Sequence, residues 1–77
     1  MDLADLDREL LKAHSREDLP SLIRLYTYAA DQHPIRSEGE AFYLTHAYVF
    51  ALEAGAPEAE ALNKRLADLG RTHRLSF

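Results

Sequence analysis

The residues of this chain that could hold a metal ion are its four histidines and the carboxylates near them. A metal site on a helix needs two ligands three or four residues apart, so that both side chains lie on one face. His33 follows Asp31 by only two residues, and His46 has phenylalanine, tyrosine or valine at these helical neighbour positions. His14 and Asp18 are four residues apart, but an expected turn separates them. We therefore expect no metal and no cofactor.

Catalytic residue types are present, but not in a catalytic pattern. Two of the four serines, Ser15 and Ser37, are accounted for as caps at expected helix starts. The sequence contains no Gly-x-Ser-x-Gly turn, no glycine-rich phosphate loop and no Glu-x-x-His motif. The sequence therefore predicts a protein that is not an enzyme. One alternative stays open, a small-molecule or metal-binding site built around His46 and Tyr43.

Composition limits the classes of partner. Nine basic residues against thirteen acidic ones give a formal charge of −4, which repels a phosphate backbone, so no nucleic acid partner is expected. The chain has no cysteine, which favours the reducing cytoplasm. The acidic N-terminal segment does not resemble a secretion signal, and no apolar run is long enough for a membrane span. We expect a cytoplasmic protein without membrane contact.

Apolar residues recur at helical spacing almost throughout, and no segment alternates with period two. This predicts an all-α fold of four antiparallel helices in two packed helical hairpins, because the connections are short. Residues 1–70 form one domain in this prediction, and residues 71–77 form a flexible or docked tail, with Leu75 and Phe77 as docking residues. The expected helices are Leu3–Ala13, Asp18–Gln32, a third helix that starts at the capping box of Ser37 and Glu40 and ends at Ala54, and Glu58–Leu69.

Each expected helix has an inward stripe, and local residues mark the helix ends. Ser15 is the predicted cap of the second helix, and Ser37 with Glu40 forms a capping box for the third. Gly55 supplies the left-handed residue that ends the third helix. Leu11 points away from its stripe. The inward residues are Leu3, Leu6 and Leu10; Leu19, Leu22, Ile23, Tyr26, Ala29 and Ala30; Leu44, Ala47, Tyr48, Ala51 and Ala54; and Ala59, Leu62, Leu66 and Leu69.

The third helix is the most unusual element, because eleven of the fourteen residues from Ala41 to Ala54 are hydrophobic. A helix that is apolar almost all round needs neighbours on several sides. The face opposite its inward stripe carries Phe42, His46, Val49 and Glu53, with Tyr43 and Phe50 at the edge. Two interpretations stay open: the first helix covers this face, or the face binds another chain, with a two-fold homodimer as the leading form.

A further contact candidate is Tyr28, which is expected on the outer side of the second helix. An ordinary surface tyrosine is the competing interpretation. The candidate interface therefore comprises Phe42, Tyr43, His46, Val49, Phe50 and Tyr28.

The second half of the chain resembles a tetratricopeptide repeat over about residues 37–70. The residues that carry the likeness are Tyr43, Ala47 and Phe50, the turn Glu53–Gly55, and Ala59 and Leu66. Small residues such as Ala47 and Ala59 let two helix axes approach closely. The resemblance implies a scaffold that binds a protein, a peptide or itself. The segment FYLTHAYVFALEAG is also similar to that of small bacterial proteins without an assigned activity, and this likeness implies none here.

Overall fold

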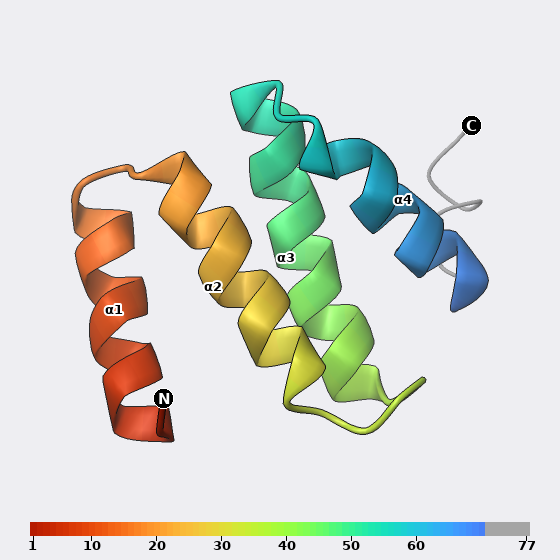
Figure 1. Ribbon diagram of the computed structural model, residues 1–77, viewed down its shortest axis with the longest axis horizontal. Coiled ribbons are helices and arrows are strands. Elements are labelled where there is room, and N and C mark those ends of the chain that lie inside the picture. The colour runs from red at the N-terminus through yellow and green to blue at the C-terminus, as the bar shows by residue number, and fades with distance from the viewer. Residues whose placement is uncertain (71–77) are drawn as a thin grey trace.

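The computed structural model describes residues 1–70 of the chain, and the predicted behaviour of the tail, 71–77, lies outside them. Four helices follow one another: α1 (Leu3–Ser15), α2 (Leu19–Asp31), α3 (Glu38–Ala54) and α4 (Glu58–Asp68). Successive helices alternate in direction and lie side by side, in an array of 34 × 28 × 16 Å (Figure 1). The predicted all-α fold of four helices is confirmed. None of the helices in the described part has the length and apolar character that crossing a bilayer requires.

Helix α2 lies at the centre of the packing, because it contributes to two clusters of buried side chains. Its closest neighbour is α3, while α1 and α4 pack more sparsely on α2 and α3, respectively. Two neighbouring faces of α2 take part in the two clusters, which explains why Leu25 is also buried although it lies outside the predicted stripe. One cluster contains Leu6, Ala13, Leu22, Leu25 and Ala29; the other contains Ile23, Ala30, Leu44, Ala47, Ala51, Leu62 and Leu66.

Two residues predicted to face inward are exposed. Leu3 is 78% exposed, because it borders an open hollow near the start of α1 instead of packing on α2. Ala54 is exposed because it is the last residue of α3, next to the turn at Gly55. Leu11 is 69% exposed, so it contacts no covering element within the described chain.

The start of α2 differs from the prediction. Ser15 is the last residue of α1, and the N-cap of α2 is Asp18. Glu17 adopts a left-handed conformation, with φ 52°, which reverses the chain between the two helices. The Asp18 carboxylate accepts hydrogen bonds from the backbone N–H of Ser21 at 3.3 Å and from its hydroxyl at 2.7 Å. Ser15 and Asp18 are both residue types that cap helices. Because α1 extends through Ser15, Asp18 is the N-cap of α2.

The Asp18 cap predicts a pH-dependent contribution to stability. The two hydrogen bonds from Ser21 lower the pKa of Asp18 below its ordinary value of 3.8. A carboxyl with a lowered folded-state pKa contributes stability above its unfolded pKa, and loses it as the pH falls through the folded value. Asp18→Asn should therefore be less stable than the parent chain at neutral pH, with a difference that disappears in strong acid. Urea midpoints at both pH values measure this, and a difference independent of pH would contradict it.

A buried carboxylate joins the α2–α3 connection to α4. Only half of the predicted capping box forms. Ser37 Oγ accepts a hydrogen bond from the Glu40 backbone N–H at 3.1 Å, but the Ser37 N–H donates to the Pro34 carbonyl and not to the Glu40 side chain. The Glu40 side chain, however, turns back and accepts from the backbone N–H of Arg36 at 2.7 Å. It also pairs with Arg65 of α4 at 3.1 Å, and the same guanidinium pairs with Asp31 at 2.9 Å. Glu40 therefore does more than cap the start of α3, which is the role that the sequence predicts for it.

Candidate interaction surface

The outer face of α3 is uncovered along most of its length. Phe42 is 57% exposed and Val49 is 51% exposed, so the interpretation in which the first helix covers this face is wrong for both residues. Helix α1 packs on α2, and reaches α3 only at its edge, where the His14 ring lies 5.7 Å from the ring of Phe50. The chain thus leaves large apolar side chains of α3 in contact with solvent.

Leu52 belongs to the same surface and was missed from the sequence. It is 55% exposed, close to the values for Phe42 and Val49. Together with exposed Thr45, these residues follow one another at intervals of three, four and three. This is the spacing of a helix–helix seam, and it was readable in the sequence. We call these four residues, Phe42, Thr45, Val49 and Leu52, the α3 stripe.

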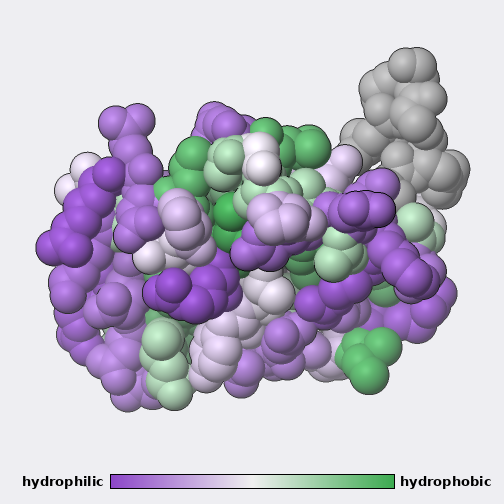
Figure 2. Space-filling model, turned by 45° about the horizontal axis from the view of Figure 1, so that its top comes forward, coloured by the Kyte–Doolittle hydropathy of each residue, from purple (hydrophilic) through white to green (hydrophobic). Residues whose placement is uncertain are grey.

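Exposed apolar residues occur at several places on the molecule, and one group of them gathers near the end of α3 (Figure 2). Figure 2 shows hydrophobic residues near the top centre, in the region where the end of α3 and the turn into α4 lie in Figure 1. The exposed large apolar residues elsewhere in the described chain are Met1, Leu3, Leu11 and Ile35. Those residues lie on α1, at the N-terminus or in the α2–α3 connection, whereas Phe42, Val49 and Leu52 share one helix face.

Rings from three helices brace the neighbouring edge of α3. The Tyr26 ring lies at the centre, stacked on His46 at 5.1 Å and on Phe50 at 5.7 Å between centroids. It also stacks on Tyr43 at 6.1 Å, and meets His14 edge-on at 5.8 Å. Such ring pairs add about 0.5–1.5 kcal/mol each beyond the area they bury. The half-buried Tyr43, His46 and Phe50, all predicted interface residues, are thus held within the protein.

Polar atoms of this ring cluster have partners inside the chain. Nε2 of His14 and the Tyr26 hydroxyl form a hydrogen bond of 2.8 Å. Nδ1 of His46 donates to the Phe42 carbonyl at 2.9 Å, because a carbonyl can only accept. Burial raises the pKa of the Tyr26 phenol above its usual range, and the neighbouring Tyr43 adds to this. His46, which the sequence places on the outer face of the third helix, is half-buried and borders the stripe.

A glycine in the first turn of α3 makes room for another ring. His33 stacks on Tyr43 at 5.2 Å between centroids. A Cβ atom at Gly39 would lie only 2.3 Å from Nδ1 of His33, so any larger residue would displace the imidazole. Glycine weakens a helix, but at position 39 its missing side chain leaves the space that the His33 ring occupies.

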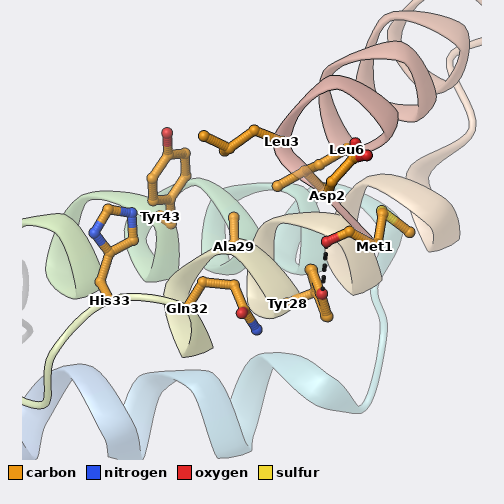
Figure 3. A pocket seen from close by; sticks show the side chains of 9 residues that line it. All are labelled: Met1, Asp2, Leu3, Leu6, Tyr28, Ala29, Gln32, His33 and Tyr43. Atoms are coloured by element: carbon orange, nitrogen blue, oxygen red, sulfur yellow. Dashed lines mark hydrogen bonds between the residues drawn. The ribbon is translucent and has the colours of Figure 1, made fainter.

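A small hollow lies between the start of α1, the end of α2 and the first half of α3 (Figure 3). Its volume is about 150 Å³, below the roughly 300 Å³ at which ligand pockets usually begin. Tyr43 lines it, together with His33 and Leu3, but His46 does not. Tyr28, a predicted contact residue, is half-buried at its rim and donates from its hydroxyl to the Met1 carbonyl at 3.2 Å. Tyr28 is therefore not part of the α3 stripe.

The predicted alternative of a ligand or metal site around His46 and Tyr43 finds no assembled donor set in the described chain. Within residues 1–70, no three side chains of histidine, cysteine, aspartate or glutamate converge on a point where a metal ion would fit. Within these same residues, His46 forms one polar contact, its hydrogen bond to the Phe42 carbonyl, and the ring otherwise faces aromatic neighbours. This alternative stays a prediction of the sequence.

Comparison with known protein families, with curated proteins and with solved structures finds no match to this chain. The resemblance to a tetratricopeptide repeat therefore stays a prediction. Because no relative supplies a function, the functional proposal is built on the geometry of the α3 stripe.

Proposed function

We propose that this protein is a small interaction module that self-associates into a homodimer through the outer face of α3. The observation that carries the proposal is the alignment of Phe42, Val49 and Leu52 along one face of α3. Each of the three is more than half exposed, although the opposite face of the same helix lies in the core. Contiguous exposed apolar side chains bordered by polar ones are typical of protein–protein contacts. A domain of this size also gains buried apolar surface by pairing.

Other features of the chain agree with an interaction module. The ring cluster of Tyr26, Tyr43, His46 and Phe50 supports α3 from the inner side, so the stripe is presented on a fixed helix. A rigid surface loses less conformational freedom on binding than a mobile one. The chain contains no cysteine and its fold needs no disulfide, so we propose the cytoplasm as its location.

Charge placed on the stripe tests the proposal. In sedimentation analysis at micromolar concentration, the parent chain should be in reversible monomer–dimer exchange. Phe42→Glu and Val49→Glu should each be monomeric with unchanged helicity, because both residues are exposed in the monomer and the charge would be buried only in the dimer.

Leu11→Glu is the matched control, since Leu11 is 69% exposed but lies on α1, away from the stripe. It should leave the dimer intact. A parent chain that stays monomeric throughout the micromolar range would overturn the proposal, as would a dimer equally sensitive to the Leu11 substitution.

A further inference from the structure

The α3 stripe is symmetric about its own midpoint. Phe42 and Leu52 lie five residues on either side of Ala47, and Thr45 and Val49 lie two residues on either side. When two identical helices pack antiparallel, a residue on one side of the midpoint lies opposite the partner's residue that is equally far on the other side of the midpoint. The stripe is therefore self-complementary, with Phe42 opposite Leu52 and Thr45 opposite Val49.

The surface of α3 also contains a socket that matches this symmetry. A shallow hollow is lined by Glu38, Ala41, Phe42, Thr45 and His46. The first four of these follow the i, i+3, i+4, i+7 pattern of the hole that receives one side chain in knobs-into-holes packing. The small Ala41 side chain is almost fully buried, which gives the hole its depth.

Leu52 is the side chain that this symmetry directs into the hole. The middle of the hole lies between Ala41 and Phe42, and the position opposite it in an antiparallel pair centred on Ala47 is residue 52 or 53. Leu52 is apolar and 55% exposed, and so is available as the knob. A two-fold axis makes the exchange reciprocal, because each copy offers one knob and one hole.

We infer that a second copy of the chain docks with its α3 antiparallel to the first, the two helices crossing midway between Thr45 and Val49, so that Leu52 of each copy enters the Glu38–Ala41–Phe42–Thr45 hole of the other. This inference rests on the proposed function, and adds to it the orientation and register of the pair. The hole, the knob and the absence of any covering element on the stripe are all features of the described monomer.

The acidic residues on this face do not distinguish the two orientations. A parallel pair would set each glutamate against its own copy, and the antiparallel pair brings Glu38 of one copy near Glu53 of the other. The antiparallel orientation is inferred from the match between the Leu52 knob and the hole.

The size of the contact sets the expected affinity. The stripe from Phe42 to Leu52 is about 15 Å long, so the pair belongs to the small interfaces, below about 1,200 Å² in total. A micromolar dimer is expected. Because Glu53 of one copy approaches Glu38 of the other, the dimer should also tighten slightly as the salt concentration rises.

Cysteine pairing tests the register, since the chain contains no cysteine of its own. Thr45→Cys and Val49→Cys are oxidised separately and as an equal mixture, with one variant carrying a mass tag. A disulfide requires Cα atoms closer than about 7 Å, which the antiparallel register provides between positions 45 and 49 but not between two copies of either. The mixed disulfide should be the main product, with little dimer from either variant alone.

The outcomes separate the inference from the proposed function. If sedimentation shows a dimer of the parent chain but each variant cross-links with itself as readily as in the mixture, the helices are parallel and the inference fails. A dimer that gives no disulfide at all places the contact on another surface, and also overturns it. A chain without any dimer refutes the proposed function itself.

Removal of the knob supplies a second test. Leu52→Ala should weaken the dimer about tenfold or more, since one leucine is lost from each of two equivalent holes. The fold should be unchanged, because Leu52 is more than half exposed in the monomer. Leu11→Ala is the matched control and should leave the dissociation constant as it is; equal affinity of all three chains would overturn the inference.

Discussion

Replacing Leu44 by alanine should lower the free energy of unfolding by about 2–5 kcal/mol. Leu44 has no exposed surface and belongs to the cluster that joins α2, α3 and α4. The substitution leaves a cavity among Ile23, Leu62 and Leu66, which α-helices already in contact cannot close without moving. A domain of this length has only about 4–12 kcal/mol of stability, so the variant should melt some 10–30 °C below the parent chain.

Leu11→Ala is the control for Leu44→Ala, because it removes the same atoms from a side chain that is 69% exposed. Its effect should stay within about 0.5 kcal/mol. Urea unfolding followed by circular dichroism, at one protein concentration for all variants, measures both. Equal losses at the two positions would mean that Leu44 does not lie at the centre of the core. If Leu44→Ala fails to fold, Leu44→Val provides the graded version of the same comparison.

The features that the sequence predicts well are local ones. Helices α3 and α4 lie within one residue of their predicted bounds, because Ser37 and Gly55 act through backbone groups a few positions away. Periodicity also identified Leu44 and Leu66 as core residues. The error at Ser15 has a local origin too: Asp18 offers the same capping chemistry, and which of the two acts depends on where α1 ends.

The exposed stripe was only partly predictable, because exposure depends on where neighbouring helices lie. The sequence predicts Phe42 and Val49 on the outer face of α3. The position of a residue around its own helix, however, does not show whether α1 covers that face. Leu52 is not among the predicted contact residues, although the sequence contains the three–four–three spacing that it forms with Phe42, Thr45 and Val49. Leu3 shows the opposite error: it has the right spacing for burial, but the open hollow next to α1 leaves it exposed.

Contacts between residues far apart in sequence could not be predicted from single-helix patterns. Tyr26 meets rings from α1 and α3, and nothing in the spacing of Tyr26 alone indicates them. Glu40 and Arg65 are 25 positions apart, and each has a sufficient local explanation at the end of its own helix. Both features result from the antiparallel order of the helices, which sets the side chains of different elements against each other.

Glu40→Gln should destabilise the chain by about 1–3 kcal/mol. The glutamine amide oxygen can still accept from the Arg36 N–H, but the charge opposite Arg65 is lost. The Glu40 side chain is only 11% exposed, whereas that of Arg65 is 36% exposed. Water therefore screens part of the pair, and the effect should lie below that of a fully buried ion pair.

Glu38→Gln is the matched control for the Glu40 substitution, because both glutamates lie in the first turn of α3 and share its helix dipole. Glu38 is exposed, so its substitution should have the smaller effect. The larger loss expected for Glu40→Gln comes from its buried contacts with Arg65 and the α2–α3 connection, which lie beyond the dipole that both glutamates share.

A double-mutant cycle of Glu40→Gln with Arg65→Met then separates the ion pair from the cap on Arg36. Arg36 has a left-handed backbone, with φ 68°, which an arginine adopts only when neighbouring contacts hold it. Since the cap survives in Glu40→Gln, the coupling energy reports the pair alone and should be about 0.5–2 kcal/mol. Glu40→Ala removes the cap as well, and should cost more than either single change. Additive effects in the cycle would show that Glu40 stabilises the connection by itself, and that α4 is held by its leucines and not by Arg65.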